Sequence, residues 1–209
     1  MMMNFVLRLF FLIGTFFVFN NAFGYNNIEA CREYIKPCYF LVTLKDQIEI
    51  TVEDAQDRVN AYSGIQSIVE RVLDIRDIAK FVMGSYWNTM SDDERARFVD
   101  EYNKYIRRIY TKQLYKYAVY DMSILSVKNP RKDIYLINTR LSDTRNVHNF
   151  VIVEFKLLVV DDRVLLSDIK VNNAISFSIN QRTVIRNMVS KNGIEGTISY
   201  FKEQNNIAK

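Results

Sequence analysis

The residues able to carry acid–base, nucleophilic or metal chemistry are few in this chain. It has one histidine, His148, and two cysteines, Cys31 and Cys38, whose spacing is not that of a C-x-x-C pair. Metal sites in proteins need several such ligands, so the sequence predicts none. We also find no G-x-S-x-G motif, no dinucleotide-binding motif and no close pair of carboxylates on a covered face. We therefore expect a protein that is not an enzyme and has no cofactor, with His148 in a loop or at a strand edge.

Large apolar side chains, in contrast, recur at helical spacing over a long stretch. Ser91 to Glu94 has the S-x-x-E form of a capping box, so a helix should begin near Asp92. Apolar residues then follow at steps of three and four as far as Tyr117, which predicts a helix of about seven turns. A shorter amphipathic helix should precede it and end at Gly84.

After this helix the apolar period changes from near four to two. Alternation over residues 119–127, 135–141, 150–160 and 164–171, with polar turns between, predicts four antiparallel strands in sequence order. Helices come before and after the strands rather than between them, which favours an α+β fold over a doubly wound sheet. We expect a curved sheet of about four strands with one buried face, covered by the helix from Asp92 and followed by C-terminal helices, in an NTF2-like arrangement.

The part of the chain before residue 72 has weaker patterns. Residues 29–35 could form a helical turn or two, which Pro37 should stop. Thr51 to Asp54 has the composition of a helix start, and apolar residues continue at helical spacing to Val72.

Residues 1–24 have the features of an export signal. Arg8 precedes an apolar run that is too short to span a bilayer, and small residues follow at Ala22 and Gly24. We expect cleavage before Tyr25, leaving residues 25–209 as a single domain; the alternative is an uncleaved anchor. Export would permit a disulfide between the two cysteines, although two reduced thiols would also fit the sequence. A net charge of +4 without dense basic runs argues against nucleic-acid binding.

Several short motifs occur in the order and spacing of one family. They are Met83 to Trp87, Ser91 to Phe98, Ile106 to Tyr110, Asp168-Ile169, Ala174 to Ser176, Asn180 to Arg182 and Asn192 to Gly196. In this set the sequence resembles the MlaC family, over about Leu73 to Lys202. It departs from the family where Asn172-Asn173 replaces a Glu-Gly pair, where Gln181 replaces a tyrosine and where Val164 replaces a tryptophan.

The resemblance implies a function as well as a fold. It suggests a periplasmic phospholipid-binding shuttle without catalysis, which carries lipid as its cargo and maintains the lipid asymmetry of the outer membrane. Its implied partners are an outer-membrane MlaA-type lipoprotein and an inner-membrane ABC transporter with an MlaD-type subunit. The alternative is an envelope interaction or scaffold protein of the same fold without cargo.

A lipid carrier needs a core that is left partly unfilled between sheet and helix. Large aromatic residues can hold such a gap open. The candidate lipid-binding residues are Ile106, Tyr110, Leu114, Tyr117, Tyr135, Ile137, Val151, Val153, Phe155, Ile175 and Phe177. Tyr110, Val151 and Ile175 are the preferred contacts, and ordinary core packing is the alternative for every member. Arg182 could either pair with Asp168 or meet a lipid phosphate.

Overall fold

The computed structural model describes residues 28–207; the expected signal segment 1–24 and its cleavage site lie outside this range. The elements, in chain order, are α1 (Ile28–Cys31), α2 (Ile35–Glu53), α3 (Arg58–Val72), α4 (Ile75–Met83), the 3-10 helix η1 (Gly84–Thr89), α5 (Asp92–Lys116), β1 (Tyr120–Arg131), β2 (Ile134–Asp143), β3 (Asn146–Val160), β4 (Arg163–Val171) and α6 (Phe177–Ile207). The expected α+β class is confirmed. Within residues 28–207, none of the helices combines the length and apolarity needed to cross a bilayer.

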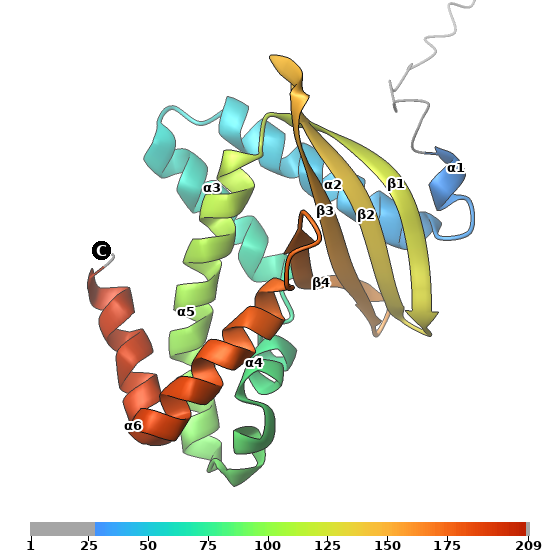
Figure 1. Cartoon of the computed structure of the whole chain (residues 1–209). Helices are drawn as coiled ribbons and strands as arrows, with labels where there is room; N and C mark the ends of the chain where they lie inside the picture. Colours follow the sequence, from blue (N-terminus) through green and yellow to red (C-terminus); the bar gives the residue numbers. More distant parts are fainter. Residues whose placement is uncertain (1–27, 208–209) are drawn as a thin grey trace, which may run out of the picture.

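The four strands form one antiparallel meander in the order β1-β2-β3-β4 (Figure 1). The pairing register shifts beside Leu125 in β1 and beside Ser167 in β4. An extra residue on one strand bends that strand and increases its twist, so these two irregularities help to curve the sheet. The concave face carries the buried side chains of each strand, among them Ile137, Val153 and Phe155.

Helix α5 begins as its capping box predicts. The Ser91 hydroxyl accepts a hydrogen bond from the Glu94 backbone N–H, and the Glu94 carboxylate accepts one from the Ser91 N–H at 2.7 Å. The preceding α4 ends at Gly84, whose φ of 56° lies in the left-handed region. Both helix ends predicted from local signals are therefore confirmed.

The helix that crosses the sheet is α2, whereas we expected the helix from Asp92 to cover it. The structure also corrects two expectations about residues 37–54. Leu41, Leu44 and Ile48 of α2 are buried against the concave face, where α2 crosses the sheet (Figure 1). Pro37 does not stop a helix; it lies in the first turn of α2, where a missing N–H costs nothing. Thr51 to Asp54 is the end of α2 rather than a start, since α3 begins at Arg58 and is capped by the Asp57 carboxylate.

The remaining helices form a second layer beside the sheet. Helix α5 packs on α3, α4 and α6, and α6 bends at Gly193, where φ is 70° (Figure 1). After this bend, Phe201 packs edge-on against Phe98, Tyr102 and Tyr105 of α5, with ring centroids 5.0–6.0 Å apart. The pattern of C-terminal helices is confirmed, and only the last turns of α5 face the sheet.

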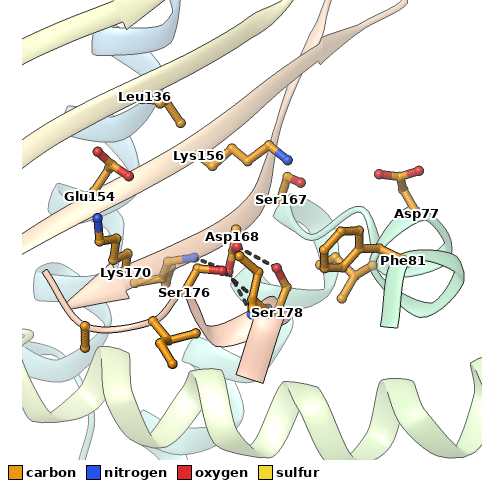
Figure 2. Close-up of a pocket in the computed structure, with 15 residues that line it drawn as sticks. Asp77, Phe81, Leu136, Glu154, Lys156, Ser167, Asp168, Lys170, Ser176 and Ser178 are labelled. Carbon is orange, nitrogen blue, oxygen red and sulfur yellow. Dashed lines mark hydrogen bonds between the residues drawn. The ribbon is translucent and has the colours of Figure 1, made fainter. Parts of the chain in front are cut away.

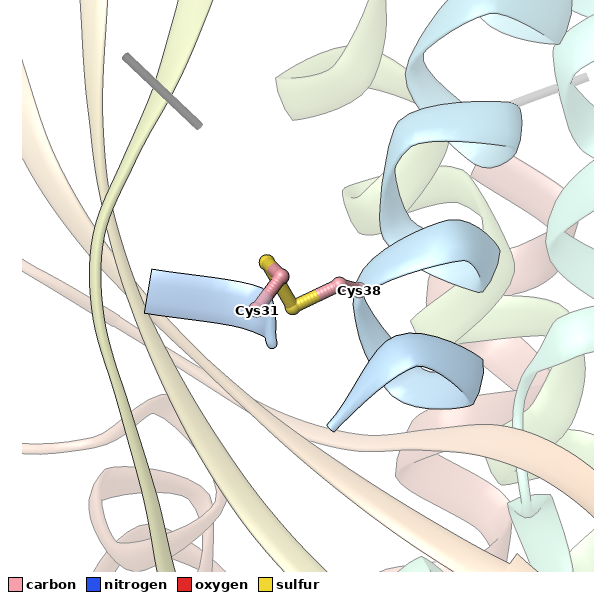
Figure 3. Close-up of a disulfide and its surroundings, with 2 residues drawn as sticks. All are labelled: Cys31 and Cys38. Atoms are coloured by element: carbon pink, nitrogen blue, oxygen red, sulfur yellow. A yellow bond between two sulfur atoms is a disulfide. The ribbon is translucent and has the colours of Figure 1, made fainter. Parts of the chain in front are cut away.

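A disulfide joins Cys31 of α1 to Cys38 of α2 (Figure 3). Cys38 is buried, and α1 also contacts β1. The bond therefore ties the short N-terminal helix to the helix that lies across the sheet. This settles the alternative between paired and reduced cysteines in favour of the pair.

We expect reduction of this disulfide to lower the free energy of unfolding by about 2 kcal/mol, the loop-closure value for a short cross-link. Urea denaturation with and without dithiothreitol measures the difference. A Cys31→Ser/Cys38→Ser double variant serves as the control and should not respond to the reductant. Equal stability of the oxidised and reduced wild-type protein would contradict this prediction.

An apolar hollow between α5 and the sheet

A hollow of about 650 Å³ lies between the last turns of α5, the concave face of the sheet and the segment that joins β4 to α6. Its volume is within the usual range of ligand pockets. The residues that line it are Ile109, Tyr110, Gln113, Leu114, Tyr117, Leu141, Val153, Phe155, Ile169, Val171, Ala174, Ile175, Phe177 and Asn180. We call this cavity the hollow.

The α5 wall follows from the helical repeat. Tyr110, Leu114 and Tyr117 lie at steps of four and three, so they share one face of the helix and project toward the sheet. Val153 and Phe155 project back from alternate positions of β3. The ring of Phe177 packs edge-on against that of Tyr110, with centroids 5.5 Å apart, and this contact holds the start of α6 at the hollow.

The hollow is electrically neutral. Among the described residues that line it, none carries a charge at neutral pH. Burial raises the pKa of the Tyr110 phenol well above its ordinary value, so this group stays protonated. The side-chain amides of Gln113 and Asn180 are exposed at the opening. A hydrocarbon chain can therefore enter without displacing an ion from its partner.

The hollow continues toward α2 through a small cavity of about 40 Å³. Leu114, Tyr117, Leu141 and Phe155 line both spaces, and Leu41, Leu44 and Ile48 of α2 close the far side of the small one. The other residues that line the small cavity are apolar or aromatic except Lys45, whose ammonium group pairs with Glu49 at 2.6 Å.

The segment between β4 and α6 forms one rim of the hollow. Asn172 and Asn173 both adopt left-handed backbone conformations, with φ of 49° and 55°. Asparagine adopts left-handed conformations more readily than most residues. This explains how Asn172-Asn173 can replace the Glu-Gly pair of the family in this turn. Asn172 also pairs with Ile152 of β3, donating its N–H to the Ile152 carbonyl at 2.7 Å and accepting from the Ile152 N–H at 2.9 Å.

Asp168 fixes the other end of this rim. Its buried carboxylate accepts hydrogen bonds from the backbone N–H and the hydroxyl of Ser178, at 3.0 and 2.5 Å, and thereby caps α6 (Figure 2). The same carboxylate accepts from the Ile169 N–H at 2.8 Å. A second cavity of about 640 Å³ lies beyond, and Ile169, Ala174 and Ile175 line both it and the hollow. The rim is therefore a thin wall between two cavities.

We expect Asp168→Asn to destabilise the protein by about 2 kcal/mol, because the buried serine loses a charged acceptor. Urea denaturation checks this value. Glu154→Gln is the control, since Glu154 lines the second cavity and makes no hydrogen bond or ion pair among the described side chains. A loss of equal size in both variants would refute a specific role for Asp168.

The structure brings most of the candidate residues together at the hollow. Those that line it are Tyr110, Leu114, Tyr117, Val153, Phe155, Ile175 and Phe177. Ile175 lies at the rim of the hollow, where it is 71% exposed. Four candidates lie outside the lining: Ile106, Tyr135, Ile137 and Val151.

These four have other surroundings. Ile106 and Ile137 are fully buried in the core, and Val151 is half-buried. The Tyr135 ring packs edge-on against Tyr34 just before α2, with centroids 5.7 Å apart. Val151, one of the preferred contacts, lies outside the lining, since the hollow opens beside Val153, two residues further along β3.

Sequence reasoning missed half of the lining. The missed residues are Ile109, Gln113, Leu141, Ile169, Val171, Ala174 and Asn180. Leu141 had a signal, since it shares the strand face of Ile137. Gln113 follows the helical repeat of the apolar face and Asn180 belongs to a family motif, but neither pattern identifies a polar side chain as part of a cavity wall.

Arg182 and His148, which the sequence analysis also discussed, lie outside the lining of the hollow. The guanidinium of Arg182 lies over the Phe81 ring, 5.0 Å from its centroid. It forms no ion pair with Asp168 among the described residues, and it does not line the hollow. His148 is exposed near the start of β3, an interior strand of the sheet. Within residues 28–207, no cluster of histidine, cysteine and carboxylate side chains has the geometry of a metal site.

A comparison with curated sequences finds no match. Among solved structures, the phospholipid-binding protein from Ralstonia solanacearum, determined in complex with a phospholipid, has a TM-score of 0.68 at 14% sequence identity, covering 82% of this chain and 98% of that one. This likeness shows a shared fold. The model of the MlaC protein family matches residues 43–203, most of the chain, and the chain therefore belongs to the MlaC family.

Proposed function

We propose that the protein binds a phospholipid by its acyl chains within the hollow. The observation that carries this proposal is an uncharged cavity of about 650 Å³ between sheet and helix in a well-buried core. The similar fold of a protein that is described as phospholipid-binding supports it.

The energetics explain why a carrier is needed. Transfer of a methylene from water to an apolar environment is worth about 0.8 kcal/mol, so some thirty methylenes amount to roughly 24 kcal/mol. Spontaneous passage of a two-chain lipid through water is therefore negligible. If the wall of the cavity is as apolar as a bilayer interior, the lipid has a similar free energy in the protein and in the membrane. Loading and release of the lipid are then both close to reversible.

Membership of the MlaC family supports a proposal for where in the cell this activity takes place. We propose that residues 1–24 direct export to the periplasm and are removed there, leaving residues 25–209 as one lipid-binding domain. The domain would shuttle phospholipid between an MlaA-type outer-membrane lipoprotein and an ABC transporter with an MlaD-type subunit, and would so maintain outer-membrane lipid asymmetry. No catalytic step is required for such transfer.

Native mass spectrometry of the exported protein, purified without detergent, tests the binding. We expect a mass shift of one phospholipid per chain and transfer of that lipid to acceptor vesicles. The lipid-free mass alone, together with no uptake from donor vesicles, would favour a scaffold of the same fold that carries no cargo.

A further inference from the structure

The face of the sheet opposite the hollow gathers an excess of cations. Residues that pair directly across antiparallel strands project to the same face, so the register places Lys128, Leu136 and Lys156 in one row across β1, β2 and β3. Parallel rows add further charges to this face. Its six cations are Lys128, Arg131, Arg140, Lys156, Arg163 and Lys170, and its two acids are Asp121 and Glu154. We call this side of the sheet the basic face.

The basic face is convex and accessible to solvent over the range that the structure describes. Helix α2 packs on the concave side, and Figure 1 shows no helix over the strands on the other side. Lys128, Arg131 and Arg163 are exposed. Lys156 and Lys170 are half-buried at the β4 edge, where they line the second cavity (Figure 2).

The charges of the basic face are not neutralised by neighbours. Among the described residues, none of the six cations forms an ion pair. The remainder of residues 28–207 carries two more acids than cations, so the excess positive charge of the described chain lies on this face. Such a charge asymmetry orients a protein in the field of a negatively charged surface.

Apolar side chains lie between the cations. Leu136, Ile152 and Leu158 are half-buried on the same face. The ring of Phe150 is 44% exposed, and the Arg140 guanidinium lies over it, 4.0 Å from its centre. A broad convex surface that mixes cations with hydrocarbon suits contact with lipid head groups, whereas peptides are usually recognised in a groove or along a strand edge.

We propose that the basic face docks the protein on the surface of an anionic phospholipid bilayer. The inference goes beyond the proposed function, and the choice of a bilayer as partner rests on it, since a lipid carrier must reach membranes. Each Lys or Arg close to an anionic leaflet increases the affinity by a factor of about five. The hollow lies on the concave side, so the loaded and the lipid-free protein should dock equally well.

Cosedimentation of the mature protein with vesicles tests the docking. The vesicles consist either of phosphatidylcholine alone or of an equimolar mixture of phosphatidylcholine and phosphatidylglycerol. We expect binding to the mixed vesicles at low salt, and loss of this binding at high salt because the surface charge is screened. Equal binding to both kinds of vesicle, or binding to neither, would overturn the proposal.

Lys128→Gln/Lys156→Gln removes two cations from one row of the basic face. We expect its affinity for the mixed vesicles to fall roughly 25-fold, with the amount of bound cargo lipid unchanged in native mass spectrometry. Lys191→Gln/Lys202→Gln is the matched control, because it removes the same charge at two exposed positions of α6. Circular dichroism verifies that each variant is folded. Unchanged binding by the first variant, or an equal loss in the control, would contradict docking by this face.

Two further comparisons separate the alternatives. Poly-L-glutamate should bind far more weakly than the mixed vesicles; equally tight binding that is lost in Lys128→Gln/Lys156→Gln would identify an acidic protein as the partner and overturn the proposal. Cargo lipid is measured separately from docking. A protein that carries lipid but binds no vesicles would overturn the docking alone, whereas one that binds vesicles but never carries lipid would refute the proposed function and leave the docking surface supported.

Discussion

Leu114→Glu should abolish stable phospholipid binding while the protein still folds. Leu114 is half-buried and lines both the hollow and the small cavity beneath it. Placing a carboxylate among hydrocarbon costs about 3 kcal/mol, which corresponds to roughly a hundredfold loss of affinity. Glutamate is a good helix former, and the opening of the hollow admits water when no lipid is bound, so α5 should persist. Lipid extraction and native mass spectrometry give the readout.

The matched control is Val147→Glu, which introduces the same charge at an exposed position of β3 outside the lining. It should retain a full complement of lipid. If Leu114→Glu is folded by circular dichroism and still contains one lipid per chain, the acyl chains do not occupy the hollow.

Phe201→Ala should have the opposite effect, a large loss of stability without a loss of lipid stoichiometry. Phe201 is 1% exposed and contacts the rings of Phe98, Tyr102 and Tyr105, which dock the second half of α6 on α5. Removing a buried phenyl ring typically costs about 4 kcal/mol through lost contacts and a residual cavity. Urea denaturation measures the change.

Tyr200→Ala tests whether this cost is specific to the buried ring. Tyr200 is half-buried next to Phe201, so its truncation should cost clearly less. Losses of similar size in the two variants would contradict the packing assigned to Phe201. Loss of lipid from folded Phe201→Ala protein would show that the helical layer and the hollow are energetically coupled.

Local signals in the sequence predicted much of the fold. The capping box at Ser91 fixed the start of α5, and alternation in residues 150–160 predicted β3 and its buried face. Helix α2 was missed although Cys38, Leu41 and Ile48 are spaced for one buried face. Pro37 was interpreted as a stop, but in the first turn of a helix a proline removes only an unpaired N–H.

The composition of the hollow was harder to predict because it depends on how α5 sits relative to the sheet. Ile106 and Tyr110 lie on one face of the same helix, yet Ile106 is sealed in the core and Tyr110 lines the cavity. Since α5 packs mainly on other helices, only its last turns reach the space above the sheet. Helical periodicity identifies a buried face but not what covers each turn of it.

The most direct test of the central claim is a crystal structure of the protein purified with its native lipid. We predict density for acyl chains between Leu114 of α5 and Val153 of β3, reaching toward Leu44 of α2. A lipid held only in the second cavity beside Asp168, or a hollow closed by side chains in the loaded protein, would contradict it.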